Sequence, residues 1–238
     1  FFELSGAAHS GGYMGPIPAA WQDAFGAEFY TGWSSVYSIV SRYSVGPSLW
    51  TFAPDDLLTG DASATAEVNA TPFMNYAYAE THLSDRAVEY AAQGEPGPFP
   101  PASPLWNILS RGRYGFFVLG TRTFSVIGST VGLETGIGYK AVQEDDNVCG
   151  GPCPYGVDDE YNYYWLFDID EILAAQNVFD PQPYAYGIWD VPFDEGGRHE
   201  VIGATLDTDT ETLYVALANA GQLGDYDRPP LILTYSLP

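Results

Sequence analysis

Four aromatic-rich runs between Leu105 and Val191 constrain the fold of this 238-residue chain more than any other feature. Each run is bounded by turn-forming residues, and in order they are LWNILS (Leu105–Ser110), GFFVLGT (Gly115–Thr121), YYWLF (Tyr163–Phe167) and YAYGIWDV (Tyr184–Val191). Aromatic and β-branched residues favour pleated, largely buried strands. Because four short antiparallel strands make one blade of a β-propeller, this stretch predicts an all-β fold containing one propeller-like blade.

The flanking sequence predicts two further, partial blades. Strands are expected at Val36–Arg42, Pro47–Phe52 and Thr71–Tyr76, and again at Val201–Leu206, Leu213–Leu217 and Leu231–Leu237. An internal repeat supports this division, since LWTFAPDDLLTG from Leu49 aligns without gaps on YWLFDIDEILAA from Tyr164. We therefore expect one domain over residues 1–238 with about three four-stranded blades, fewer than the roughly four to eight of a closed propeller.

Helices are expected to be few. Pro18 suits the start and Gly26 the end of a helix at Ala19–Phe25. A second short helix is expected at Ser84–Ala92, before a proline-rich connector at Gly94–Pro101. The longest connection, Arg122–Tyr161, is the candidate recognition surface, because long loops in compact domains are commonly functional.

The chain is strongly acidic, with 31 Asp and Glu against eight Lys and Arg and a formal net charge of −23. Such a charge disfavours free nucleic acid and anionic membrane surfaces as partners. It fits ordinary solubility, a high-salt habitat or a cationic partner, and it does not bear on the fold. No apolar run reaches the length of about 18 residues that a membrane-spanning helix needs.

Cys149 and Cys153 lie in the sequence CGGPC, where Gly-Gly-Pro can fold the chain back on itself. This spacing predicts a local disulfide and hence an extracellular or periplasmic location. A zinc site is disfavoured because no His is near and structural zinc normally takes four ligands. The chain begins with Phe1 and not with Met, so we expect that an N-terminal portion has been removed.

Asp207, Asp209 and Glu211 alternate along one loop and are the candidate calcium ligands, since calcium prefers carboxylate and other oxygen ligands. The EF-hand pattern is absent, and the same DTDT run is typical of a hairpin turn. No cofactor is expected, and calcium is the one candidate that the sequence offers. No HExxH, GxSxG, P-loop or dinucleotide signature occurs, so no catalytic residue is predicted.

Arg42, Arg113 and Arg122 lie in or beside expected strands and are candidate ligand-binding residues. They either pair with carboxylates across strands or form a pocket for an anionic ligand. Trp165 is a further candidate, as one of the aromatic side chains that could form a platform for a glycan; the others are Trp106, Tyr163 and Trp189.

Four segments carry a resemblance to a known family. They are GYMGPIPAAWQDAFG (Gly12–Gly26), SIVSRYSVGPSLWTF (Ser38–Phe52), YYWLFDIDEILAA (Tyr163–Ala175) and IGATLDTDTETLYVAL (Ile202–Leu217). Together they resemble a family of uncharacterised, secreted bacterial β-propeller-like proteins whose chains are longer on the N-terminal side. The resemblance implies a propeller-like fold and export from the cell, and it transfers no catalytic residue because no activity is assigned to the family.

These observations predict a secreted, non-catalytic structural or interaction subunit of an extracellular or periplasmic assembly. Other protein subunits, or the missing N-terminal portion, are expected to complete the propeller in preference to a second copy. The alternative is a carbohydrate-binding or carbohydrate-cleaving propeller. Exposed aromatic rings beside polar groups would favour the glycan alternative, whereas buried rings would favour the structural module.

Overall fold

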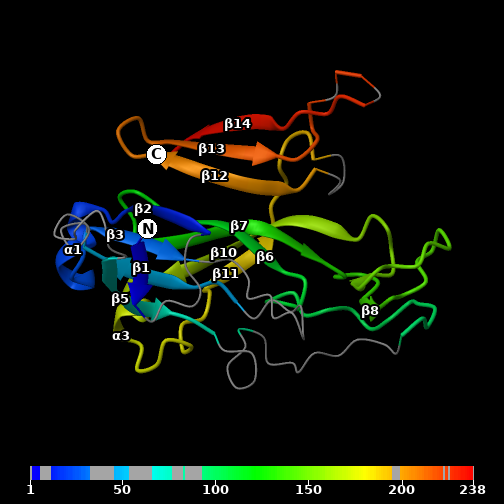
Figure 1. Ribbon diagram of the computed structural model, residues 1–238, viewed down its shortest axis with the longest axis horizontal. Helices are drawn as coiled ribbons and strands as arrows, with labels where there is room; N and C mark the ends of the chain where they lie inside the picture. The colour runs from blue at the N-terminus through cyan, green and yellow to red at the C-terminus, as the bar shows by residue number, and fades with distance from the viewer. Residues whose placement is uncertain are drawn as a thin grey trace.

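The computed structural model describes residues 2–5, 12–32, 46–53, 66–76, 83, 93–194, 199–221, 223–224 and 226–237. Strands predominate in these residues and form four sheets, which confirms the all-β fold (Figure 1). The expected strand Val36–Arg42, with Arg42 itself, and the expected helix Ser84–Ala92 lie outside the described residues.

The first sheet has five strands in the order β1-β5-β4-β3-β2. In chain order they are β1 (Phe2–Ser5), β2 (Tyr13–Pro16), β3 (Phe29–Gly32), β4 (Leu49–Phe52) and β5 (Ala66–Met74). Strands β2 to β5 are successive antiparallel neighbours, while β1 pairs in parallel with β5. Helix α1 (Ala19–Phe25) joins β2 to β3 and ends at Gly26, whose φ of +64° favours glycine, so the predicted helix is confirmed.

The second sheet is the four-stranded antiparallel sheet that the aromatic runs predict, although its strands are not all the expected ones. It comprises β6 (Arg111–Phe117), β7 (Thr123–Val131), β10 (Glu160–Asp168) and β11 (Ala185–Ile188), in the order β11-β10-β7-β6. Strand β7 comes from the segment expected to be a long excursion, Arg122–Tyr161. That expectation is wrong for its first part, because a tight turn after β6 returns the chain directly, with Thr121 N donating to Val118 O.

The expected strand Leu105–Ser110 is also wrong. Its backbone turns around Asn107, whose side-chain oxygen accepts a hydrogen bond from Leu109 N at 2.9 Å and whose carbonyl accepts one from Ser110 N at 3.0 Å. Asparagine competes with strand pairing in this way because its side chain imitates a backbone acceptor. The aromatic side chain of this run, Trp106, is buried against Trp165 with the ring centroids 4.5 Å apart.

The third sheet confirms the three strands expected at the end of the chain. They are β12 (Val201–Asp207), β13 (Thr212–Leu217) and β14 (Leu231–Ser236), paired antiparallel in that order. Helix α3 (Ile169–Ala174) follows β10, and the Asp168 carboxylate caps it by accepting from Asp170 N. The acids of the repeated segment therefore start a helical turn, as the sequence predicts.

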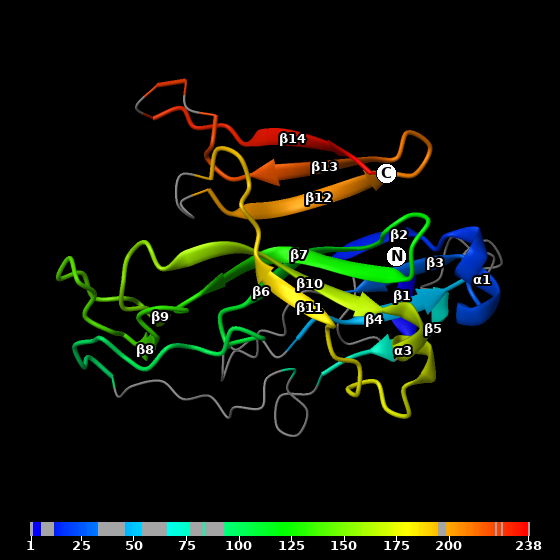
Figure 2. The same cartoon turned by 180° about the vertical axis from the view of Figure 1, so that it is seen from behind.

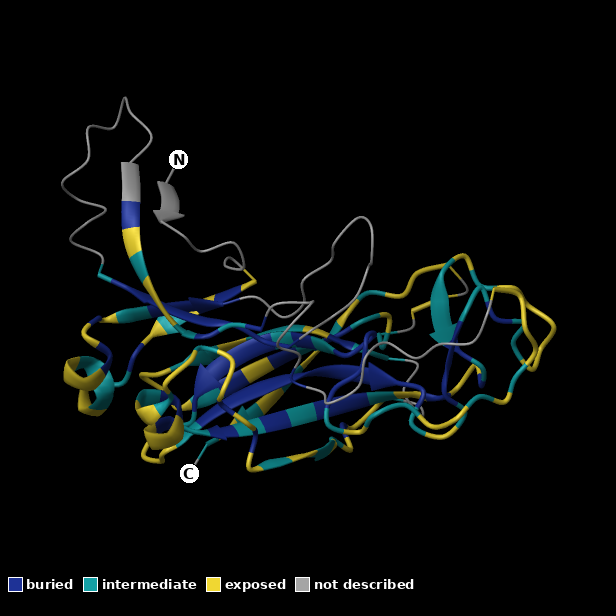
Figure 3. Cartoon of the chain, turned by 90° about the horizontal axis from the view of Figure 1, so that it is seen from below, coloured by how far each residue is buried: buried dark blue, intermediate teal, exposed yellow. Residues whose placement is uncertain are grey.

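The smallest sheet is the hairpin β8 (Ile137–Tyr139) and β9 (Pro152–Pro154). It forms an arm that extends away from the other sheets (Figures 1 and 2). The predicted disulfide is confirmed in this arm, where Cys149 and Cys153 are bonded with their Cα atoms 6.4 Å apart. Figure 3 shows mostly buried strands in the body of the molecule, whereas intermediate and exposed residues predominate in the arm.

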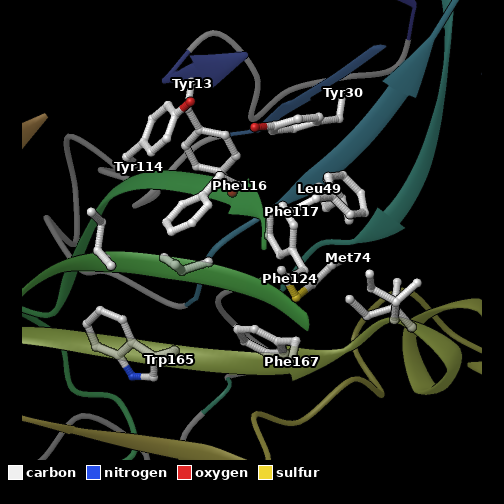
Figure 4. Close-up of a cluster of buried hydrophobic side chains, with 14 of the residues drawn as sticks. Tyr13, Tyr30, Leu49, Met74, Tyr114, Phe116, Phe117, Phe124, Trp165 and Phe167 are labelled. Carbon is white, nitrogen blue, oxygen red and sulfur yellow. The ribbon is translucent and has the colours of Figure 1, made fainter. Parts of the chain in front are cut away.

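The first three sheets share one continuous hydrophobic core. The first strand of the second sheet, β6, contacts β2 of the first sheet and β12 of the third. Aromatic side chains fill the space between the first and second sheets (Figure 4). At the closest approach a side chain would not fit at Gly115, where an added Cβ would lie 2.7 Å from the Tyr13 ring and 2.8 Å from the Phe124 ring.

Candidate functional site

The most elaborate polar cluster joins the second sheet to the third, and we call it the polar seam. Its members are Arg111, Arg113, Ser129, Glu160, Asn162, His199 and Glu200. Strands β6, β7 and β10 present five of these residues at neighbouring ends, and the segment leading into β12 brings the other two. This arrangement concentrates charge at one end of an otherwise apolar junction.

Glu200 is the centre of the polar seam. Its Oε1 atom lies 2.8 Å from Arg113 Nη2 and 3.4 Å from Arg111 Nη1, and it accepts a hydrogen bond of 2.7 Å from Ser129 Oγ. Burial alone would raise the pKa of this carboxyl, but the Ser129 hydrogen bond and the two arginine charges outweigh burial and lower the pKa. Glu200 is therefore held as a paired carboxylate.

The pKa of Glu160 is shifted in the opposite direction, upward. Partial burial raises the pKa of its carboxyl, and the neighbouring Glu200 charge raises it further, while Arg111 opposes the shift. Together with Tyr161 and Asn162 these side chains line a small cavity of about 10 Å³. Such a volume suits about one water molecule, so it is too small for a sugar ring or a nucleotide.

Asn162 completes the connection between the two sheets. Its Nδ2 donates to His199 O at 3.1 Å, and its Oδ1 accepts from Val201 N at 2.8 Å. The backbone of the third sheet takes part as well, because Ala218 N donates to Glu200 O at 2.9 Å. The geometry of the polar seam is thus that of a structural link between sheets.

Two of the predicted ligand-binding arginines are paired with carboxylates. Arg113 belongs to the polar seam, and Arg122 lies 2.9 Å from Asp168 and 3.0 Å from Asp170 at an exposed site. The hydrogen bond to Asp168 and the charges of both aspartates raise the pKa of Arg122. Arg113 and Arg122 thus pair with carboxylates, as the first of the two interpretations expects, and binding of an anionic ligand by these residues stays a prediction.

The candidate calcium loop is organised as a hairpin turn between β12 and β13. The Asp207 carboxylate accepts from Thr210 Oγ1 at 2.7 Å, Asp209 N at 3.0 Å and Thr210 N at 3.3 Å, and these bonds lower its pKa. Across the described residues, no group of three or more His, Cys, Asp or Glu side chains is placed to hold a metal ion. Calcium binding by Asp207, Asp209 and Glu211 stays a prediction.

The predicted aromatic platform is mostly inside the protein. Trp165 is 0 % exposed and donates from Nε1 to Leu105 O at 2.6 Å, while Tyr163 donates its hydroxyl to Pro104 O. Trp106 is buried as well, and Trp189 packs partly buried against the core. Trp165 therefore stabilises the core at the position where we expected a glycan contact.

Sequence reasoning did not single out Glu200, the residue on which the polar seam depends. It is one acid among 31, and its partners Arg113 and Ser129 are 87 and 71 residues away along the chain. The only local signal was the pair of arginines, Arg111 and Arg113, at alternate positions of a strand.

Comparisons of the chain with protein-family models, with curated proteins and with solved structures give no match. In the described part of the chain, no helix has both the length and the apolar character that crossing a membrane requires.

Proposed function

We propose that this chain is a non-catalytic, propeller-like structural module that works through its surface as a subunit of a secreted assembly. The observation that carries the proposal is the arrangement of three sheets around one core, in which the third sheet has an exposed outer face.

Each of the three stacked sheets contains successive strands that follow one another in space in chain order: β2 to β5, β6-β7-β10-β11, and β12 to β14. The leading strands β2, β6 and β12 lie at the centre of the stack, because β6 contacts both of the others. Up-and-down sheets that meet at their first strands are typical of propeller blades. This arrangement supports three propeller-like blades that share one core.

In the described part of the chain, the outer face of the third sheet carries exposed side chains. Cross-strand rows on this face are Thr205–Tyr214–Thr234 and Gly203–Ala216–Ile232, while the alternate residues face the core. Tyr214 and Ile232 are 37 % and 54 % exposed. Exposed apolar side chains gathered on one sheet face are typical of interaction sites. This face is where a further blade from another polypeptide would pack.

The carbohydrate alternative has less support, because Trp106, Tyr163 and Trp165 are buried, Trp189 is partly buried, and the cavity of the polar seam holds about one water. An extracellular or periplasmic location fits the disulfide of the arm, since such bonds persist in oxidising compartments.

The test is isolation of the protein from its native cell envelope or medium, with sizing by light scattering and identification of bound polypeptides. We expect an assembly larger than the 25.9 kDa of one chain. Tyr214→Glu should release the partner polypeptide without lowering the melting temperature. Val148→Glu, a matched change at an exposed apolar residue of the arm, should keep it. A chain found alone in every fraction would overturn the proposal.

A further inference from the structure

Strand β14 is an edge strand without the usual protection against pairing with another strand. Its outer side pairs with no strand of the described chain, and its six residues, LILTYS, include no charge and no proline. Proteins usually protect such an edge with charge, proline or a very short strand, because unpaired amides and carbonyls invite another strand. The outer strand of the second sheet, β11, is protected because it has only four residues, with Pro183 and Pro192 close to its ends.

The hydrogen-bond pattern identifies the free groups of this edge. Leu237 N donates to Glu211 O at 2.8 Å, and Ser236 lies opposite Thr212. In an antiparallel ladder these facts direct the backbone groups of Leu231, Leu233 and Tyr235 toward β13, and those of Ile232, Thr234 and Ser236 outward.

The opposite edge of the sheet gives an independent check of this assignment. The same alternation directs Leu206 N of β12 away from β13, and Leu206 N indeed donates to the Tyr114 hydroxyl at 3.0 Å. On the inner edge of the third sheet, the outward N–H of Leu206 is therefore hydrogen-bonded by the second sheet. On the outer edge, β14 pairs with no described strand.

We propose that a second copy of this chain pairs antiparallel with β14 about a two-fold axis at Thr234. In this register the two Thr234 residues exchange backbone hydrogen bonds, and Ile232 lies opposite Ser236 of the second copy. Leu233 lies opposite Tyr235 of the second copy on the inner face, so both half-buried side chains gain apolar cover. The pairing is isologous and closes on itself, as two-fold contacts do. It goes beyond the proposed function, because it uses an edge and not the exposed outer face.

The charges around this edge argue for a second copy as the occupant. Strand β14 carries no charge of its own, so two copies pair without like charges opposite each other. Arg228, which follows Asp227, lies three residues before β14, and the acidic turn with Asp209 and Glu211 lies beside the end of β14. Antiparallel two-fold pairing brings Arg228 of each copy toward the acidic turn of the other. The net charge of −23 repels the copies at longer range, and salt screens this repulsion, with a Debye length of about 10 Å at 0.1 M, so the association is measured at and above that salt concentration.

Cross-linking tests the register. A hydrogen-bonded pair on the two-fold axis has Cα atoms about 5.5 Å apart, so Thr234→Cys should give a covalent dimer on a non-reducing gel when a short bifunctional maleimide is added. The cross-linker is used because the Cβ atoms of such a pair lie farther apart than the roughly 3.5–4.5 Å of a direct disulfide. Thr205→Cys is the matched control: it lies on the same face, but its counterpart in the dimer would be about 24 Å away at five strand spacings. The native cysteines do not interfere because they are bonded to each other.

Light scattering gives the second measurement. The unmodified chain should show about twice its 25.9 kDa mass at high concentration and salt. Thr234→Pro removes one outward N–H and should give a monomer, whereas Thr234→Val keeps the N–H and should stay dimeric, with circular dichroism confirming that both fold. A monomeric wild type, or equal cross-linking at 234 and 205, would overturn the inference. The proposed function would be unaffected, since its test follows a different polypeptide and Tyr214.

Discussion

The junction between the first and second sheets differs in kind from the junction between the second and third. The first is aromatic: Phe124 is 0 % exposed, and its ring lies 5.2 Å from Phe117, 5.9 Å from Tyr30 and 6.5 Å from Tyr13 between centroids. Its polar atoms are tyrosine hydroxyls bonded to backbone carbonyls, such as Tyr30 to Gly115 O at 3.0 Å. No charged group takes part in these contacts.

The second junction combines smaller side chains with charge. Val201, Leu213 and Val215 supply its buried apolar part, and the polar seam closes one end through Glu200. The first junction should therefore respond to changes of volume and be insensitive to pH. The second should respond to the ionisation of Glu200, and the third sheet should open locally before the rest unfolds.

The largest expected effect is at the first junction. Phe124→Ala should lower the free energy of unfolding by about 3–5 kcal/mol, because it removes a buried ring and leaves a cavity among rings that cannot all collapse into it. Urea unfolding measures the loss, which should be the same at pH 5 and pH 8. Phe179→Ala, at a ring that is 38 % exposed, is the control and should cost far less. A loss below about 1 kcal/mol would mean that this junction is not the main core.

The next effect is at Glu200. Glu200→Gln should cost about 2–3 kcal/mol at pH 7, because Arg111 and Arg113 lose their charged partner and charged hydrogen bonds are worth roughly 1.5–3 kcal/mol. The pKa of Glu200 is lowered in the fold, so its contribution is present above the ordinary value of 4.5 and is lost as pH falls through the folded value. The difference between variant and wild type should therefore shrink as pH falls below 4.5 and disappear once Glu200 is protonated in the folded protein.

Glu160→Gln is the matched control for that experiment. The pKa of Glu160 is raised in the fold, so its ionised form is disfavoured there; its contribution to stability is present at low pH and is lost as pH rises through the folded value. Neutralising it should not destabilise the protein at pH 7. Equal losses for the two variants would contradict the opposite roles of these carboxyls.

The sequence predicted strands correctly where the residues of the run themselves favour a buried sheet. It predicted them poorly where a single side chain or the burial of both faces decides the conformation. The runs at Tyr163 and Val201 form strands as expected, because their patterns match buried sheet positions. LWNILS has the same composition, but the hydrogen bonds of Asn107 decide its turn. Thr123–Val131 was missed although six of its nine residues are β-branched or aromatic. The strand is buried on both sides, so it lacks the polar and apolar alternation of a half-buried strand, and we assigned it to a long connection.

The disulfide lies outside both junctions, and its removal is expected to lower the stability less than the changes at Phe124 and Glu200. Replacing Cys149 and Cys153 by Ser should cost at most about 2 kcal/mol, because closing so short a loop removes little chain entropy. Thermal unfolding measures the loss. The pH dependence assigned to Glu200 should be unchanged in the double variant. Labelling of both cysteines by an alkylating reagent in the unreduced wild type would contradict the bond itself.

The smallest expected change in stability is the difference between two tyrosine substitutions at the second junction. The Tyr114 hydroxyl accepts from Leu206 N at 3.0 Å, so Tyr114→Phe leaves a backbone N–H without its partner and should cost about 1–2 kcal/mol. The Tyr235 hydroxyl is buried with no hydrogen-bond partner among the described residues, while its ring packs 5.6 Å from Trp189. Tyr235→Phe keeps the ring contact and removes an unpaired polar group, so it should be neutral or slightly stabilising. Urea unfolding of the two variants decides the comparison. A clear loss of stability in Tyr235→Phe would show that the Tyr235 hydroxyl has a hydrogen-bond partner. Polar contacts would then extend through the second junction beyond the end that Glu200 closes.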